Sequence, residues 1–147
     1  MIGYFDTSAV VPLVVAEPSS VRCGQVWETC DVRVSSVLVV AEAHAALAMA
    51  LRMGRLTTRE HGAAARLLGR RIDELDLFLV TREIADSAAR LALAHALRGC
   101  DAVHAATALA LSSDDLVAVC GDQVLLTAFT ALEISTIDTN APETTDG

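Results

Sequence analysis

The sequence predicts an α/β domain in which a parallel sheet of four to five short strands is flanked by helices. Two features indicate this class. Short apolar segments alternate with longer helical patterns, and within each short segment apolar residues follow one another without alternating with polar ones, as in strands buried on both faces. The length of 147 residues and the hydrophobic content of 53% suit one domain with a substantial core. We expect this domain to span residues 1–138, and residues 139–147 to form a polar, flexible tail.

Capping and turn residues divide the first half of the chain into elements. Hydroxyl and acidic residues after the first strand can cap a helix, a proline breaks that helix, and a glycine ends the longest one. Thr57 and Glu60 have the spacing of a capping box, which indicates where the next helix begins. In chain order we expect a strand at 2–5, helices at 8–15 and 19–29, a strand at 32–34, a helix at 36–53 and a helix from Thr57 to about residue 73.

The same alternation continues in the second half of the chain. Thr81 can cap a helix, Gly99 breaks it, and Asp101 opens the next one. In chain order we expect a strand at 77–80, helices at 82–98 and 101–111, a strand at 116–119, a short helix that contains Leu125 and Phe129, and a fifth strand at 134–137. The helix at 36–53 is apolar at nearly every position, so we expect it to lie deep in the core.

Four carboxylates occur where apolar segments meet other structure. Asp6 and Asp122 follow predicted strands, Glu42 lies within an apolar helical pattern, and Asp101 opens another. A buried carboxylate is costly unless a cation neutralises it. The chain has no Lys, and the one Arg within three residues of any of these acids is Arg98, before Asp101. Because ligands of parallel sheets gather beyond the carboxyl ends of the strands, we expect the four acids to share one crevice.

Four carboxylates in one pocket favour a divalent metal. Two of them about 4 Å apart repel by roughly 4 kcal/mol at an effective dielectric constant of about 20. Mg²⁺ and Mn²⁺ prefer oxygen ligands and relieve this repulsion. A divalent cation also makes a bound water a better nucleophile and stabilises charge on a phosphodiester oxygen. The pattern therefore predicts metal-dependent hydrolysis of phosphodiester bonds.

The overall charge opposes nucleic-acid binding, but one basic cluster does not. The net charge is -8 and the isoelectric point about 4.8, so a nucleic-acid substrate would need metal ions and a local basic patch. Six of the 11 basic residues are Arg52, Arg55, Arg59, Arg66, Arg70 and Arg71. This cluster is either a solvated helix face or a surface that contacts phosphates or an acidic partner segment.

The cysteines and the N-terminus indicate the compartment. The four cysteines form no CxxC pair and no paired Cys/His spacing, which argues against a zinc site. We expect free, mostly buried thiols in a reducing cytoplasm. No basic segment precedes a hydrophobic one at the N-terminus, so we expect no secretory signal, and the apolar run at 9–16 is too short to span a membrane.

The four acids lie in four short motifs. These are Asp6-Thr7-Ser8-Ala9 after the first strand, the helix-borne Glu42, Asp101-Ala102-x-His104-Ala105-Ala106-Thr107-Ala108, and Asp122-x-x-Leu125 after a late strand. Together they resemble the motifs of PIN-domain ribonucleases, and more closely those of the VapC toxins of type II toxin–antitoxin pairs. The resemblance covers about residues 2–137. It implies a PIN-like three-layer domain, Mg²⁺ or Mn²⁺ as cofactor, endonucleolytic cleavage of RNA, a homodimer, and a cognate VapB antitoxin that inserts an arm near the active site.

The resemblance also implies roles for individual residues. Asp6 and Asp101 match the metal ligands, and Glu42 matches a third acid that holds metal or orients the attacking water. Ser8 matches a small hydroxyl residue that bonds a metal-bound water or a substrate phosphate. Asp122 matches a fourth acid.

Position 120 departs from the family pattern. The family commonly has Thr two residues before the last acid, where this chain has Cys120. A lost hydroxyl would weaken the hydrogen bonding that positions Asp122. We expect His104 to be a hydrogen-bonded structural residue rather than a catalytic base.

Other interpretations exist for the acids and for the whole chain. Asp6 and Asp101 could be helix caps, Glu42 a solvent-edge residue and Asp122 an ordinary turn residue. Aspartyl phosphatases also place an Asp after the first strand, but they need a second Asp where this chain has Ser8. Receiver domains also use an acidic Mg²⁺ pocket. Both classes need a Lys, which this chain lacks. The alternative function that stays open is a catalytically inert PIN-like module that only binds protein partners.

Overall fold

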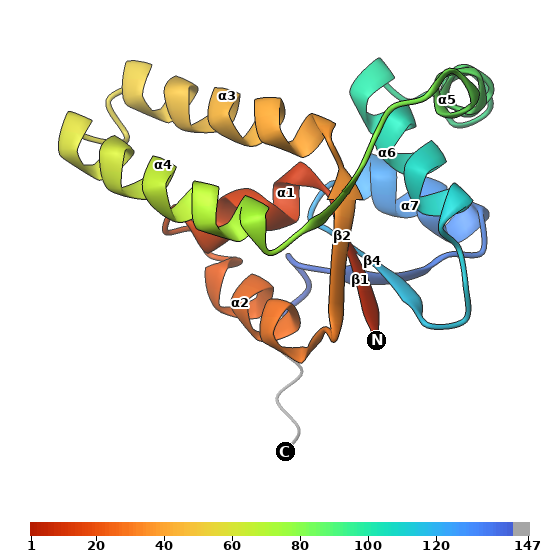
Figure 1. Cartoon of the computed structure of the whole chain (residues 1–147), viewed down its shortest axis with the longest axis horizontal. Helices are drawn as coiled ribbons and strands as arrows, with labels where there is room; N and C mark the ends of the chain where they lie inside the picture. Colours follow the sequence, from red (N-terminus) through yellow and green to blue (C-terminus); the bar gives the residue numbers. More distant parts are fainter. Residues whose placement is uncertain (143–147) are drawn as a thin grey trace.

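One parallel sheet forms the centre of the computed structural model, which describes residues 1–142 (Figure 1). The strands are β1 (Ile2–Phe5), β2 (Val32–Ser36), β3 (Asp76–Phe78), β4 (Leu116–Cys120) and β5 (Ser135–Asp138). Their order is β3-β2-β1-β4-β5, and every neighbouring pair is parallel. The carboxyl ends of β1 and β4 therefore lie side by side at the middle of the sheet. The predicted α/β class with a parallel sheet is confirmed.

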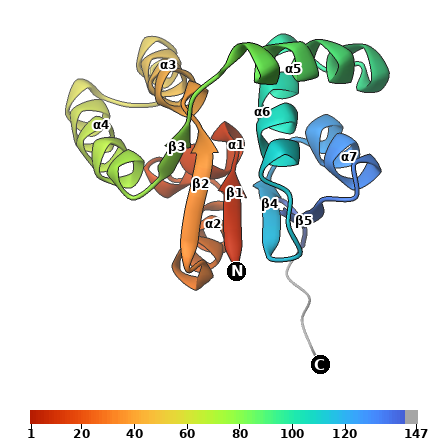
Figure 2. The same ribbon diagram turned by 45° about the vertical axis from the view of Figure 1, so that its right-hand side comes forward.

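Helices cover both faces of this sheet and make three layers (Figure 2). The elements are α1 (Thr7–Val10), the 3₁₀ turn η1 (Val11–Leu13), α2 (Ser20–Thr29), α3 (Leu38–Arg52), α4 (Thr58–Asp73), α5 (Arg82–His95), α6 (Gly99–Ala110) and α7 (Gln123–Ala131). One apolar core joins β1 to α1, α2, α3 and α4, and a second joins it to α5, α6 and α7. The predicted capping box at Thr57 and Glu60 begins α4.

The central strand β1 supplies both cores, because successive side chains of a strand point to opposite faces. Tyr4 lies in the core of α5 to α7, 6.4 Å from Phe129 between ring centroids. Phe5 lies in the other core, 4.8 Å from Trp27. Asp6 follows Phe5 at the end of β1, where the two helix layers meet.

Several predicted element boundaries differ from the structure, and three of the differences have a clear local reason. The first helix ends early because Pro12 cannot donate the next hydrogen bond, and the chain continues as the turn η1. The strand predicted at 77–80 leaves the sheet before Leu79, which is 72% exposed. The helix predicted at 82–98 ends at His95 because Ala96 adopts a left-handed conformation with φ 52°.

The prediction that the helix at 36–53 lies deep in the core is wrong. Only one stripe of α3 is buried, and Met49 and Met53 are 50% and 66% exposed. An α-helix packed against one layer buries one face whatever its composition. The small alanine side chains on the outer face expose little apolar area each, so the apolar composition of α3 does not indicate burial.

Chain packing continues beyond β5. Thr139 is 2% exposed, its N–H donates to the Cys120 carbonyl, and the Asn140 side chain donates to the Gly121 carbonyl at 2.9 Å. The first residues of the predicted tail therefore support the loop after β4, and residues 143–147 of that tail lie outside the described residues. Among residues 1–142, no helix is both long enough and apolar enough to cross a membrane.

Candidate functional site

All four acids singled out in the sequence line one pocket of about 270 Å³. It lies at the carboxyl ends of β1 and β4, where the two helix layers meet. Its lining residues are Asp6, Thr7, Ser8, Val11, Glu42, Ala46, Arg98, Asp101, His104 and Asp122. They include Ser8, for which the family resemblance implies a role in the site. Four separate segments of the chain thus bring their carboxylates to the crevice that the sheet topology predicts.

Asp6 is the most buried of these acids, at 4% exposure. It follows β1 directly and caps α1, as its side chain accepts from the Ser8 N–H at 3.3 Å and from the Ser8 hydroxyl at 2.7 Å. Burial raises the pKa of Asp6, against the opposing effects of His104 and of the Ser8 hydrogen bonds. The cap interpretation and a functional role are compatible, since a desolvated carboxylate that faces a pocket favours a bound cation.

Ser8 ties the ends of β1 and β4 together. Its hydroxyl donates to Asp6 and accepts from the Gly121 N–H at 2.8 Å. A Cβ on Gly121 would lie 2.8 Å from the Thr139 hydroxyl and 3.0 Å from the Asn140 side chain, so a larger residue here would have to displace these side chains. The loop after β4 is therefore held tightly against the first acid.

Cys120 takes the place of the hydroxyl residue that the family pattern predicts. It is fully buried, and its sulfur accepts from the Asp122 N–H at 3.3 Å. The Ser8 hydroxyl also lies 3.7 Å from this sulfur. Burial is the main cause that raises the pKa of the Cys120 thiol. The neutral thiol thus positions the Asp122 backbone as a hydroxyl would, with the weaker bonds typical of sulfur.

Asp122 divides its two oxygens between structure and pocket. Oδ1 accepts from the Leu125 N–H at 3.0 Å and caps α7. Oδ2 lies 4.0 Å from a terminal nitrogen of Arg98, and the side chain is 32% exposed. The turn interpretation of Asp122 therefore describes one oxygen and leaves the other facing the pocket.

Glu42 is held firmly by neighbours on two other elements. Its Oε1 accepts from the Thr7 hydroxyl at 2.9 Å and from His104 Nε2 at 2.6 Å. Burial by itself would raise the pKa of Glu42, but the hydrogen bonds and charge of His104, with Thr7, lower it below its ordinary value of 4.5. Within residues 1–142, Oε2 accepts no hydrogen bond, so it is the oxygen that is available to a ligand.

His104 is the buried, hydrogen-bonded histidine that the sequence predicts. It is 1% exposed, and its Nδ1 lies 2.8 Å from the Tyr4 hydroxyl. In the tautomer with its proton on Nε2, the ring donates to the Glu42 carboxylate and its Nδ1 accepts from the Tyr4 hydroxyl. The chain from Tyr4 through His104 to Glu42 fixes the direction of this carboxylate.

Asp101 lies in the first turn of α6 and is not its cap. The helix begins two residues earlier than predicted, at Gly99, with Arg98 in the cap position. The Asp101 side chain is 17% exposed, and Oδ2 accepts from Arg98 Nε at 3.1 Å. Oδ1 accepts no hydrogen bond within residues 1–142, so the helix start aims one free carboxylate oxygen at the pocket.

Sequence reasoning assigned no site role to Thr7, His104 or Arg98. Arg98 carried a visible signal, since its position three residues before Asp101 is one helical turn away. Thr7 and His104 both bond Glu42, from positions 35 and 62 residues away in the sequence, so only the fold brings these groups together.

The pocket offers the chemistry of a divalent-cation site without a finished coordination shell. Among residues 1–142, no three His, Cys, Asp or Glu side chains converge closely enough to hold a metal as they stand. The carboxylates of the pocket are oxygen donors, and Oε2 of Glu42 and Oδ1 of Asp101 are free of hydrogen bonds within that range. Such a donor set fits a hard cation that keeps several of its waters.

Comparison with known proteins identifies relatives of this chain. A PIN domain family model matches residues 3–128. The chain is 41% identical over 130 residues to Ribonuclease VapC45 of Mycobacterium tuberculosis (strain CDC 1551 / Oshkosh), and the match covers 84% of this chain and 86% of the relative.

Solved structures share the fold of this chain. PAE2754 from Pyrobaculum aerophilum has a TM-score of 0.68 at 23% identity, and the match covers 95% of this chain and 92% of that one. A toxin-antitoxin complex from Klebsiella pneumoniae has a TM-score of 0.66 at 14% identity, covering 95% and 99%. The two structures show a shared fold.

Proposed function

The chain belongs to the PIN domain family, and we propose that it is an endoribonuclease that acts as the toxin of a type II toxin–antitoxin pair. One observation carries this proposal: four carboxylates from four separate segments line one pocket at the carboxyl ends of β1 and β4. A structural scaffold gains nothing from collecting acids in this way, because their mutual repulsion destabilises it. The name of the 41% identical relative, Ribonuclease VapC45, supports RNA as the substrate.

Mg²⁺ or Mn²⁺ is the proposed cofactor, with Asp6 and Asp101 as its proposed ligands. Burial of Asp6 and the free Oδ1 of Asp101 support this choice. When bound, the cation would lower the pKa of a water molecule and stabilise negative charge on the scissile phosphate.

The remaining residues are proposed to position the reacting groups. Glu42 would orient the attacking water through Oε2, because Thr7 and His104 already hold Oε1. Asp122 would add negative charge at the pocket through Oδ2 while Oδ1 caps α7. Ser8 donates its one hydroxyl hydrogen to Asp6, so it would reach a substrate phosphate as a donor only after releasing that acid.

Mn²⁺ should raise the melting temperature of the purified protein, and Asp6→Asn should remove the rise. A ligand at 100 times its Kd stabilises the folded state by about 2.7 kcal/mol, which corresponds to roughly 5–10 °C for a domain of about 150 residues. Differential scanning fluorimetry with and without Mn²⁺ measures this. Asp114→Asn, in the exposed loop before β4, is the matched control and should keep the rise. An equal rise in Asp6→Asn would place the metal elsewhere.

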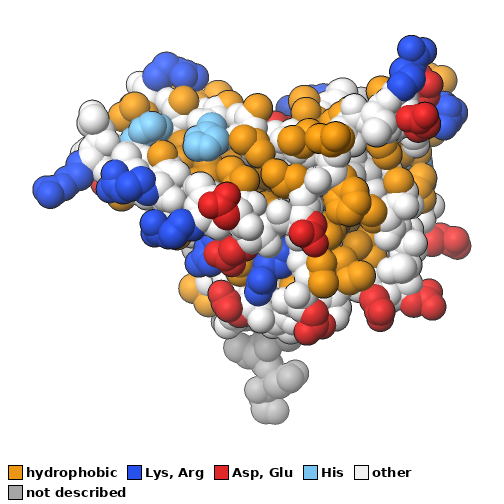
Figure 3. Space-filling view, in the orientation of Figure 1, with side chains coloured by type: hydrophobic (Ala, Val, Ile, Leu, Met, Phe, Trp, Pro, Cys, Tyr) orange, Lys and Arg blue, Asp and Glu red, His pale blue; other side chains and the backbone are white. Residues whose placement is uncertain are grey.

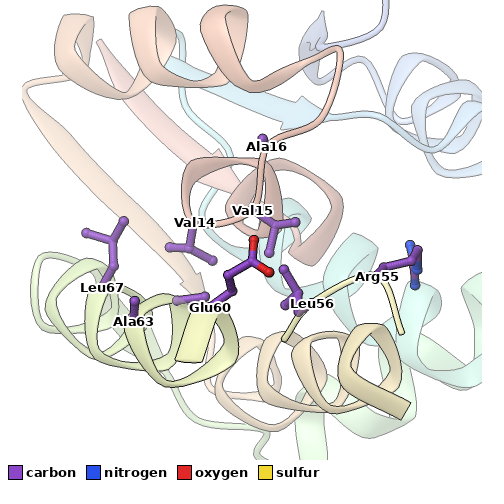
Figure 4. A pocket seen from close by; sticks show the side chains of 9 residues that line it. Val14, Val15, Ala16, Arg55, Leu56, Glu60, Ala63 and Leu67 are labelled. Carbon is purple, nitrogen blue, oxygen red and sulfur yellow. The ribbon is translucent and has the colours of Figure 1, made fainter. Parts of the chain in front are cut away.

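A cognate VapB-type antitoxin is the proposed partner. A groove of about 380 Å³ lies between the segment after η1 and α4, and Figure 4 shows Val14 and Val15 facing Ala63 and Leu67 across it. Arg55 and Glu60 are charged residues of the same groove. Arginines gather over α3 and α4 on the face that Figure 3 shows. The groove therefore suits an antitoxin segment with an apolar face and flanking acidic residues, while cationic antitoxin side chains would enter the acidic pocket.

Ala63→Arg should abolish stable binding of the antitoxin without lowering the melting temperature of the toxin. Ala63 is exposed on α4, so a long charged side chain would occupy the groove without disturbing the core. Co-purification with the product of the adjacent gene measures binding. Ala94→Arg makes the same change on an exposed position of α5 and should leave the complex intact. A complex that survives Ala63→Arg would show that the partner docks elsewhere.

A homodimer in the cytoplasm is the proposed working form. The four cysteines are free thiols, which suits a reducing compartment. The dimer rests on the family resemblance. Light scattering on the purified protein tests it against the chain mass of 15.4 kDa.

A further inference from the structure

Arg98 is the one Lys or Arg that lines the acidic pocket within residues 1–142. It occupies the cap position of α6, makes no side-chain cap hydrogen bond, and its side chain is 83% exposed. The guanidinium reaches across the first turn of the helix to Asp101, at 3.1 Å, and lies 4.0 Å from Asp122. One exposed cation therefore spans two of the four acids.

This pairing partly neutralises the pocket but holds the arginine only weakly. Ion pairs between exposed groups contribute little, because water screens them and two long side chains lose freedom. The hydrogen bond to Asp101, with the negative charges of Asp101 and Asp122, raises the pKa of the Arg98 guanidinium, which therefore stays positively charged. A charged group that is weakly held at a pocket mouth can exchange one anionic partner for another.

We propose that Arg98 binds a phosphate of the RNA backbone, and that without ligands it rests on Asp101 and Asp122, where its positive charge opposes the binding of a divalent cation in the pocket. The inference rests on the proposed function. A guanidinium presents a planar fork of donors that matches two phosphate oxygens. A divalent cation held by Asp6 and Asp101 would weaken the attraction of the guanidinium to Asp101 and Asp122, and would leave it available to a backbone phosphate.

The charge of the whole chain makes a local cation necessary. With a net charge of -8, the protein repels RNA at long range. The arginines of α3 and α4 do not line this pocket. Arg98 is placed to offset the repulsion next to the acids themselves, where a scissile phosphate would have to lie.

Two binding measurements on Arg98→Gln test the proposal, with Arg90→Gln as the matched control. Arg90 is exposed on α5 and forms no ion pair within residues 1–142. Isothermal titration with Mn²⁺ alone should show binding at least about threefold tighter in Arg98→Gln than in the wild type, since a competing positive charge has left the site. Arg90→Gln should bind Mn²⁺ as the wild type does.

RNA binding is measured in Mn²⁺ in a Glu42→Gln background, which keeps the proposed metal ligands Asp6 and Asp101 and removes the residue that is proposed to orient the attacking water. A fluorescein-labelled, random-sequence RNA oligonucleotide should bind about tenfold more weakly after Arg98→Gln. The slope of log K against log salt should fall by about 0.7, the value for one phosphate contact with a single strand. Arg98→Lys, which keeps the charge and loses the planar fork, should restore the slope but not the full affinity.

The outcomes separate this inference from the proposed function. Unchanged Mn²⁺ affinity and an unchanged salt slope in Arg98→Gln, with RNA still bound, would overturn the role of Arg98 alone. Failure of the Glu42→Gln parent and of the wild type to bind any RNA in Mn²⁺ would overturn both proposals. Tighter Mn²⁺ binding together with the reduced salt slope is the expected result.

Discussion

Asp101→Asn is expected to reduce RNA cleavage in Mn²⁺ by about a thousandfold or more while the protein stays folded. Asp101 turns a carboxylate into the pocket from the first turn of α6, and its Oδ1 is free of hydrogen bonds within residues 1–142. Asparagine keeps the volume and an oxygen for Arg98 but loses the negative charge. A charged ligand contributes several kcal/mol to the transition state, and about 1.4 kcal/mol is worth tenfold in rate.

Single-turnover cleavage of a labelled RNA measures this effect, with the melting temperature as a check of folding. Asp114→Asn removes the same charge in the exposed loop before β4 and should cleave at the wild-type rate. Full activity of a folded Asp101→Asn protein would exclude Asp101 as a ligand.

His104→Ala is expected to lower the free energy of unfolding by about 3 kcal/mol. The imidazole is 1% exposed and bridges the Tyr4 hydroxyl and the Glu42 carboxylate. Its removal leaves a cavity and a buried hydroxyl without its acceptor, and each of these is costly. Chemical denaturation measures the loss. His104→Gln, whose amide can still donate to Glu42, should retain a substantial part of the stability, whereas equal losses in the two variants would show that packing alone matters.

The acid dependence of stability should change in the same variant. Although burial acts to raise it, the pKa of Glu42 is lowered in the folded state by His104 and Thr7. A lowered pKa means that the Glu42 contribution is present above about pH 4.5 and is lost as the pH falls through the folded pKa. Without His104 this contribution is smaller, so the stability of His104→Ala should fall less on acidification than that of the wild type. Parallel pH profiles would contradict this account of Glu42.

Local patterns were sufficient to predict most of the architecture. The capping box at Thr57 and the parallel strands follow from spacing and from apolar runs, which act over a few residues. Because the carboxyl ends of parallel strands lie at one edge of a sheet, the positions of Asp6 and Asp122 after two strands place both acids at that edge. The apolar composition of α3 did not predict its burial correctly. It indicated a helix deep in the core, but the fold exposes Met49 and Met53.

Contacts between distant segments could not be predicted in this way. Tyr4 and His104 are 100 positions apart and Ser8 and Gly121 are 113 apart, so no sequence spacing indicates either hydrogen bond. The consequence for the site is specific. The sequence indicates which acids meet, but only the fold shows that Glu42 has one oxygen held and one free, and that Arg98 spans two of the acids.

Incubation of the purified, partner-free protein with total cellular RNA, in Mn²⁺ and in EDTA and beside Asp6→Ala, tests the central claim most directly. The account predicts discrete cuts that need the metal and are absent in Asp6→Ala, and mapping the new ends would identify the target RNA. A folded protein that binds Mn²⁺ but cuts no RNA in any metal would contradict the claim and favour an inert module that binds protein partners.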